Sequence, residues 1–296
     1  MVEVASTAPR PLSLAGGRLA GLAWGRTDAP TWLALHGWLD NAASFTRLAP
    51  RLARALGVRI VALDFRGHGH SAHGPAQTDY ALWDYAFDVL DALDELEIER
   101  ATLLAHSMGA AVSCLLAAAL PERVEKLLLV DGLGALNTEA EQSTEQLRKG
   151  LLAHRRQASR TPRYADLERA VAARVAGGVT PVSASTITPV VERNIRASPD
   201  GKIEMRTDAR LLKPSLVRFT PEQVLMMLAS IQAPVLLVEG DSGILGERRW
   251  AQEARQQVPH LTRQVLLGGH HLHLEMDAVE AVAATIVDYC QRQMNV

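Results

Sequence analysis

The chain has 296 residues, of which 48% are hydrophobic, and its formal net charge at pH 7 is −2. This length and composition allow one large domain with a buried core, and the near-neutral charge gives no electrostatic basis for binding nucleic acid or an anionic membrane. The first ten residues lack the pattern of a signal peptide, and no apolar run reaches the length of a membrane span. Cys114 and Cys290 lie in apolar helical patterns, which is typical of buried free thiols. We therefore expect a cytoplasmic protein.

Short apolar runs alternate with helical patterns in the first half of the chain. Residues 11–23 predict a hairpin, and buried strands are predicted at 31–36, 59–64, 103–105 and 124–131. Between the strands, helical spacing covers residues 48–56, 80–97 and 109–119. This alternation, with nearly continuous apolar strands, predicts a mostly parallel sheet covered by helices on both faces.

The pattern changes between residue 132 and about residue 221. Charged, helix-favouring segments at 139–155, 164–175 and 189–195 are broken by glycines and prolines, and no strand is predicted before 233–239. A helix at 248–258, a strand at 262–267 and a helix at 279–294 follow. We predict an α/β core formed by residues 1–135 and 222–296, with a helical cap, or lid, at 136–221. A second, independent helical domain is the alternative, but the insertion has few apolar residues for a core of its own.

Ser107 lies where a predicted strand turns directly into a predicted helix. Ala105 and Gly109 stand two residues before and after it, and small residues at these positions let the two elements approach closely. The pattern small-x-Ser-x-Gly is that of a nucleophile elbow, with Ala105 in place of the stricter first glycine. The alternative is that Ser107 only caps the helix, since serine is a favoured N-cap residue.

Other polar residues stand at the ends of the predicted strands, where parallel sheets bind their ligands. They are His36-Gly37-Trp38, Asp64, Ser107 and Asp131. The coincidence favours a catalytic role for Ser107 over a capping role.

Four motifs in this order resemble those of proteins with the α/β-hydrolase fold, from about Pro11 to the C-terminus. They are His36-Gly37-Trp38, the segment Asp-Phe-Arg-Gly-His-Gly-His-Ser at 64–71, Ala-His-Ser-Met-Gly at 105–109, and Gly269-His270 with Glu275. The segment His-Gly-Trp-Leu-Asp-Asn-Ala-Ala-Ser-Phe at 36–45 also resembles the serine hydrolase-like subgroup. The resemblance implies an α/β-hydrolase fold: a mostly parallel central sheet, helices on both faces and a helical lid insertion.

A serine hydroxyl needs a base within hydrogen-bond reach to act as a nucleophile. His270 is the candidate, because it follows the last predicted strand in the chain order nucleophile, acid, histidine, and the family pattern places the base directly after the glycine. His271 and His273 are rivals for which packing or substrate contact is the more plausible role. A metal site at these three histidines is conceivable, but no carboxylate cluster accompanies them in the sequence, so we expect neither a metal nor another cofactor.

The acid and the oxyanion hole complete the predicted site. Many relatives place an aspartate where this sequence has Gly243, and Asp241 lies two residues too early. Some haloalkane dehalogenases use instead a carboxylate at the preceding strand end, which corresponds to Asp131. We favour Asp131, with Asp241 as the alternative; Asp131 could also serve only as a turn residue. The resemblance assigns the oxyanion-hole N–H groups to Trp38 and Met108.

The predicted function is that of a serine hydrolase, carboxylesterase-like, acting by acyl transfer on a small ester or thioester. Hydrolysis of a carbon–carbon bond would use the same residues. A dehalogenase or epoxide hydrolase would need a carboxylate where Ser107 stands. The alternative from another class is a non-catalytic ligand-binding protein of the same fold. The expected partner is a small-molecule substrate, and neither its identity nor the oligomeric state follows from the sequence.

Overall fold

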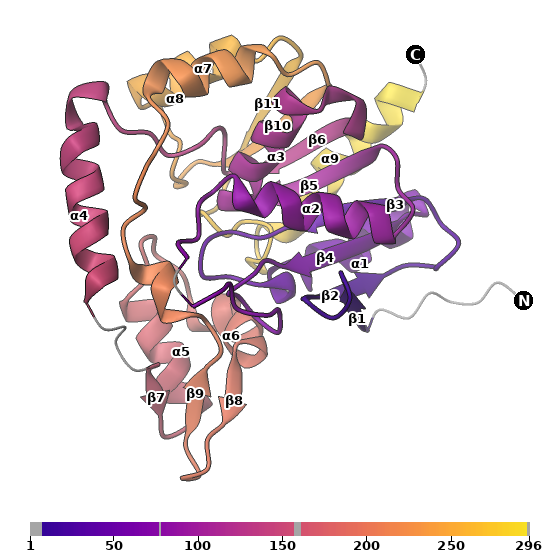
Figure 1. Ribbon diagram of the computed structural model, residues 1–296. Coiled ribbons are helices and arrows are strands. Elements are labelled where there is room, and N and C mark those ends of the chain that lie inside the picture. The colour runs from indigo at the N-terminus through magenta and orange to yellow at the C-terminus, as the bar shows by residue number, and fades with distance from the viewer. Residues whose placement is uncertain (1–7, 77, 157–160, 295–296) are drawn as a thin grey trace, which may run out of the picture.

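The computed structural model describes residues 8–76, 78–156 and 161–294, and an eight-stranded sheet forms its centre (Figure 1). The strand order is β1 (Arg10–Leu14), β2 (Leu19–Trp24), β4 (Arg59–Asp64), β3 (Thr31–Leu35), β5 (Ala101–His106), β6 (Val124–Val130), β10 (Val235–Gly240) and β11 (Leu261–Leu266). β1 and β2 pair antiparallel, as do β2 and β4, and every later neighbour is parallel. The predicted sheet architecture is confirmed.

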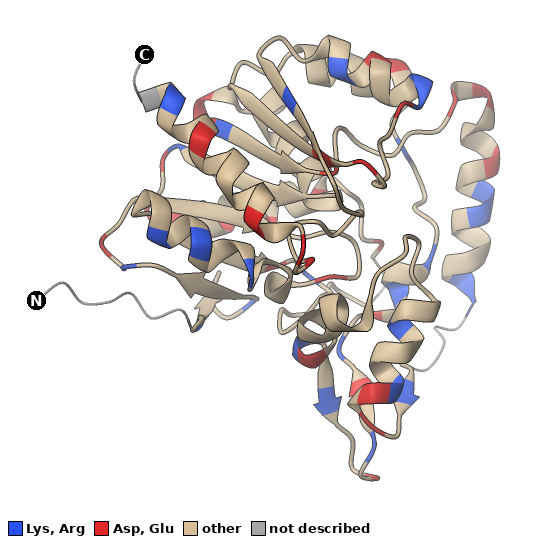
Figure 2. Cartoon of the chain, turned by 180° about the vertical axis from the view of Figure 1, so that it is seen from behind, with Lys and Arg blue, Asp and Glu red and all other residues tan. Residues whose placement is uncertain are grey.

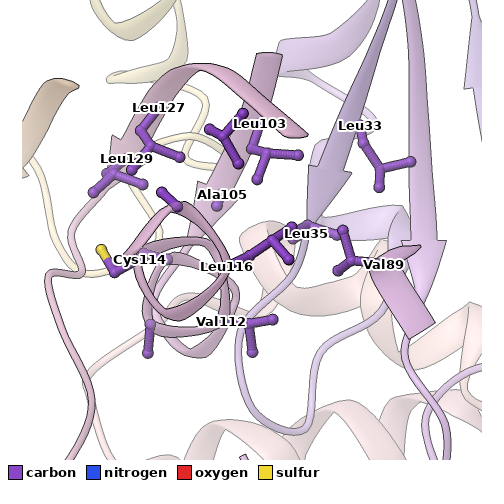
Figure 3. Packing of buried hydrophobic residues seen from close by; sticks show 14 of the residues in the cluster. Leu33, Leu35, Val89, Leu103, Ala105, Val112, Cys114, Leu116, Leu127 and Leu129 are labelled. Carbon is purple, nitrogen blue, oxygen red and sulfur yellow. The ribbon is translucent and has the colours of Figure 1, made fainter. Parts of the chain in front are cut away.

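Helices cover both faces because alternate residues of each strand point to opposite sides of the sheet. On one face, Leu33 and Leu35 of β3 belong to the core that packs under α2 (Asp84–Glu95), α3 (Met108–Ala119), α7 (Pro221–Ala229) and α8 (Arg249–Gln257). On the other face, Trp32 and Ala34 pack with α1 (Leu48–Leu56) and α9 (Val279–Met294). Figure 3 shows the first core, where Leu116 of α3 lies among the leucines of β3, β5 and β6. Two short 3₁₀ helices also lie between these elements: η1 (Ala42–Phe45) is buried, whereas η2 (Pro121–Arg123) has no buried residue.

The insertion between β6 and β10 is not purely helical, so the prediction of no strand in this region is wrong. It contains η3 (Ala140–Gln142), α4 (Ser143–Arg155), β7 (Arg163–Tyr164), α5 (Leu167–Ala176), α6 (Ala184–Arg193), β8 (Ile195–Ala197), β9 (Ile203–Met205) and η4 (Ala209–Leu212). β7, β9 and β8 form a small antiparallel sheet. Strands of two or three residues are too short to show the alternation from which a strand is predicted.

The helix predicted at 189–195 instead begins at Ala184 and contains Pro189. Ser183 caps it by accepting a hydrogen bond from the backbone N–H of Thr186. Proline lacks the N–H that would bond the carbonyl of Ser185, four residues earlier. That carbonyl accepts a hydrogen bond of 2.7 Å from Arg47 of the core instead. The core thus compensates for a proline inside a helix of the insertion.

Acidic and basic residues both occur on the outer helices in the view of Figure 2, and along α4 the acidic Glu145 precedes the basic Arg148, Lys149 and Arg155. Among the described residues, no helix combines the length and the apolar character that a membrane crossing requires.

Candidate active site

Ser107 occupies a strained turn between β5 and α3. Its φ of 51° and ψ of −113° lie outside the backbone regions that residues other than glycine normally adopt. Its side chain makes no capping hydrogen bond to α3, so the capping alternative has no support. Gly109 is required here, because a Cβ at that position would lie 2.1 Å from the carbonyl oxygen of Leu35. The turn therefore presents the Ser107 hydroxyl away from its own backbone.

His270 reaches Ser107 from the loop after β11. Its Nε2 lies 3.0 Å from Oγ of Ser107. Glu275 holds the start of this loop, since both of its carboxylate oxygens accept from the N–H of Gly269, at 3.0 and 3.1 Å. His106 holds the His270 backbone by donating from Nε2 to its carbonyl oxygen, at 2.9 Å. The base candidate is thus fixed from both sides.

Asp131 is the carboxylate that contacts His270, with 2.6 Å between Oδ2 and Nδ1. It follows β6, is fully buried and has a φ of 41°. Its backbone N–H donates to Val238, and Oδ2 also accepts from the N–H of Ile244 at 2.8 Å. These bonds satisfy a buried charge, which would otherwise be costly. The carboxylate is therefore oriented before any substrate binds.

Asp241 and Gly243 show how the loop after β10 accommodates Asp131. Asp241 is exposed and accepts from the backbone N–H of Gly268 at 3.0 Å, and no contact joins it to His270. A Cβ at Gly243 would lie 2.1 Å from Oδ1 of Asp131. The carboxylate at the end of β6 thus occupies space that a side chain at position 243 would need.

Of the two candidate oxyanion-hole residues, Met108 follows Ser107 directly, and Trp38 follows Gly37, where a Cβ would lie 3.2 Å from Cβ of Ser107. Met108 is the first residue of α3, whose N-terminus favours negative charge. The backbone N–H groups of Trp38 and Met108 donate no hydrogen bond to any described residue. The Trp38 side chain is not free, because its Nε1 donates to the carbonyl of Leu211 in the insertion, at 3.0 Å.

A buried polar cluster lies next to His270. The sequence indicates packing or substrate-contact roles for His271 and His273 but does not link them to Asp40 and His106. Asp40, His106, His271 and His273 are each at most 3% exposed. Burial is the main cause that lowers the pKa of His273 to about 3 and lowers the pKa of His106 far below its usual value, with neighbouring histidines adding to both effects. Both imidazoles are therefore neutral at pH 7.

Asp40 joins this cluster to the insertion. Its Oδ2 lies 3.1 Å from Nε2 of His271, and Oδ1 accepts from Arg174 of α5 at 3.2 Å. Although burial opposes its charge, the contacts with His271 and Arg174 lower the pKa of Asp40 below its usual value. Asp40 lies in the segment 36–45 that resembles the serine hydrolase-like subgroup, but no sequence pattern connects it with residues 106 and 271.

Comparison with known proteins defines the class of this fold and site. The model of the alpha/beta hydrolase fold family matches residues 30–277, and the chain belongs to that family. It is 32% identical to a serine hydrolase-like protein of Dictyostelium discoideum, over 87% of this chain and 74% of that one. It is 30% identical to a serine hydrolase-like protein of Danio rerio, over 94% of this chain and 86% of that one.

Two solved structures extend the comparison. A hypothetical protein from Pseudomonas aeruginosa PAO1 is 44% identical, with a TM-score of 0.88 over 96% of this chain and 99% of that one. A thioesterase domain from the curacin biosynthetic pathway is 29% identical, with a TM-score of 0.79 over 95% of this chain and 98% of that one. The resemblance to the α/β-hydrolase fold and to the serine hydrolase-like subgroup is confirmed.

Proposed function

We propose that this protein is a serine hydrolase that acts by acyl transfer on a small ester or thioester. The observation that carries the proposal is the continuous line of contacts from the Ser107 hydroxyl through both nitrogens of His270 to Asp131, over 3.0 and 2.6 Å. Nucleophile, base and orienting carboxylate in this arrangement are what acyl transfer requires. The similarity to a thioesterase domain supports including thioesters.

In the proposed reaction, Oγ of Ser107 attacks the substrate carbonyl while its proton passes to Nε2 of His270. The N–H groups of Trp38 and Met108 stabilise the resulting oxyanion. Collapse of the tetrahedral intermediate expels the alcohol or thiol, which takes the proton from His270, and leaves an acyl-enzyme. Water then attacks the ester carbonyl, gives its proton to His270, and a second collapse releases the acid and restores Ser107. Asp131 stabilises the imidazolium at both stages.

We also propose that residues 136–221 form a lid over this site. Five side chains among the described residues 38–64 bond the insertion. Trp38 donates to the carbonyl of Leu211, Asn41 to that of Val190 and Arg47 to that of Ser185, while Asp40 accepts from Arg174 and Asp64 from Arg193. These contacts attach the insertion next to the loop that carries Trp38. The free, buried Cys114 and Cys290 support a reducing, cytoplasmic location.

The test is covalent labelling with a fluorophosphonate, which reacts with activated serines. We expect wild type to be labelled at Ser107, Ser107→Ala to lose the label, and Ser242→Ala, at an exposed serine in the loop after β10, to keep it. Hydrolysis of a short-chain p-nitrophenyl ester and of a short-chain acyl thioester by the same three proteins would then rank the two substrate classes by kcat/KM. A folded wild type that takes no label and hydrolyses neither substrate would favour the non-catalytic, ligand-binding alternative.

A further inference from the structure

The cluster next to His270 brings together three side chains of the kinds that bind transition metals. Asp40 comes from the loop after β3, His106 is the last residue of β5, and His271 follows β11. One potential ligand atom from each lies within 4.8 Å of the other two. Oδ2 of Asp40 is 3.1 Å from Nε2 of His271 and 3.6 Å from Nδ1 of His106. Two imidazole nitrogens and one carboxylate oxygen are a common ligand set for zinc.

The hydrogen bonding of His106 shows that one of these atoms lacks a partner. Nε2 of His106 faces the carbonyl oxygen of His270, which can only accept, so Nε2 carries the proton. In the tautomer that carries its proton on Nε2, Nδ1 presents a lone pair, and it has no hydrogen-bond partner among the described residues. It faces Oδ2 of Asp40 at 3.6 Å, and the same oxygen contacts Nε2 of His271 at 3.1 Å. A buried polar atom without a partner is unfavourable, and a cation bound between Nδ1 of His106 and Oδ2 of Asp40 would supply one.

The surroundings leave these atoms available to a cation. Arg174 bonds Oδ1 of Asp40 and leaves Oδ2 toward the histidines. The second nitrogen of His271, Nδ1, makes no hydrogen bond within the described part of the chain, so it can carry the ring proton while Nε2 binds a metal. Three ligands leave a fourth tetrahedral position open.

We propose that Asp40, His106 and His271 form a transition-metal site, and that Zn²⁺ bound there inhibits the hydrolase. The rings of His106 and His271 lie 4.5 and 5.2 Å from the ring of His270, measured between centroids. His106 also donates a hydrogen bond to the carbonyl oxygen of His270, and His271 directly follows His270 in the chain. Zinc ligands lie about 2.0–2.2 Å from the metal, so both histidines must close on the ion. This movement draws His270 away from Ser107. The inhibitory part of the proposal rests on the proposed function, and the binding part does not.

Binding is measured directly on the full chain, by calorimetric titration with Zn²⁺ and by the visible absorption of added Co²⁺. We expect one ion per wild-type chain and at least about a tenfold loss of affinity in His271→Ala and Asp40→Asn. His273→Ala is the matched control, because it removes a buried histidine of the same loop that is outside the ligand set. It should bind as wild type does. Circular dichroism establishes that each variant is folded, and Asp40→Asn keeps the shape of the side chain in case His271→Ala does not fold.

His270→Ala separates this site from a metal on the catalytic base, and it should retain zinc binding. The proposal is overturned if wild type binds no Zn²⁺ or Co²⁺, if His271→Ala and Asp40→Asn bind as tightly as wild type, or if His270→Ala alone loses the ion. In the ester assay, Zn²⁺ should inhibit wild type and His273→Ala over the same concentration range in which it binds. Binding without any hydrolysis in the metal-free wild type would contradict the proposed function and leave the metal site standing. Binding without inhibition of an active enzyme would overturn the inhibitory role.

Discussion

At the scale of single residues, Asp131 and Gly243 depend on each other, because the Asp131 carboxylate fills the space next to Gly243. Among the described residues, Asp131 is the carboxylate in contact with His270, and Gly243 supplies the space that its carboxylate needs. A site with its acid after β10 would instead need an acidic residue at position 243 and a small residue at position 131. The two positions are therefore alternatives, since both side chains cannot occupy this space together.

We predict that Gly243→Ala damages catalysis although it removes no polar group. The new methyl group displaces the Asp131 carboxylate from His270, and we expect kcat of the ester assay to fall at least about 100-fold, in the direction of Asp131→Ala. The double variant Gly243→Ala/Asp131→Ala should lose little more than Asp131→Ala alone, because the carboxylate that the methyl displaces is already absent. Asp241→Asn serves as control and should keep most of the activity. Additive losses would show that the methyl group does not act through Asp131, and a large loss in Asp241→Asn would show that Asp241 is the acid.

At the scale of elements, the end of α6 is fixed to the end of β4 by a buried ion pair. Arg193 donates to both carboxylate oxygens of Asp64, at 2.8–3.1 Å, and the two side chains are 12% and 0% exposed. Asp64 also accepts from the backbone N–H groups of Ala42 and His70, both at 2.8 Å. One carboxylate thus joins η1, the turn after β4 and the insertion.

We predict that Arg193→Leu lowers the free energy of unfolding by about 3–5 kcal/mol, because it leaves the Asp64 charge buried without its partner. The matched control is Arg196→Leu, three residues further along. Arg196 pairs with Glu204 at the surface and its side chain is 54% exposed, so its loss should cost less than about 1 kcal/mol. Urea denaturation of the three proteins gives the comparison. Equal effects of the two substitutions would mean that the buried pair does not hold the insertion.

The same elements show what the sequence could predict. A buried parallel strand is a continuous apolar run, which predicts β3, β5, β6 and β10, and five consecutive residues predict the sharp turn at Ser107. The position of His270 after the last strand predicts that it lies near Ser107, and the two side chains are 3.0 Å apart. By contrast, β7, β8 and β9 are too short to show an alternating hydrophobic pattern in the sequence. Helix α6 contains Pro189, and the carbonyl of Ser185 that this proline leaves unbonded accepts a hydrogen bond from Arg47 of the core. The cluster of Asp40, His106 and His271 joins three distant parts of the chain, and only the strand order brings their loops together.

At the scale of the whole molecule, the core and the insertion are stabilised very differently. β5 and β6 lie in the middle of the sheet with apolar packing on both faces. The buried apolar cluster of the insertion is much smaller and takes one of its members from the core: Ala170, Val171, Ile187, Val190, Val191 and Leu274. Leu211 of the insertion also packs into the larger core, and the other attachments include polar bonds to residues 38–47 and 64–80. Such polar bonds stabilise less than the apolar burial of the sheet core. We therefore infer that the insertion can open while the sheet stays intact.

Native-state hydrogen exchange measures this difference. We predict that backbone amides of β5 and β6 exchange only through global unfolding, whereas those of α5 and β9 exchange through an opening that costs at least about 1.4 kcal/mol less, a tenfold difference in protection. The two groups should also differ in their dependence on urea, because opening the insertion exposes less surface than unfolding the molecule. Arg193→Leu should reduce the protection of α5 and β9 more than Arg196→Leu does. If α5 and β9 were as protected as β5, with the same dependence on urea, the insertion would be an integral part of the core and could not act as a lid.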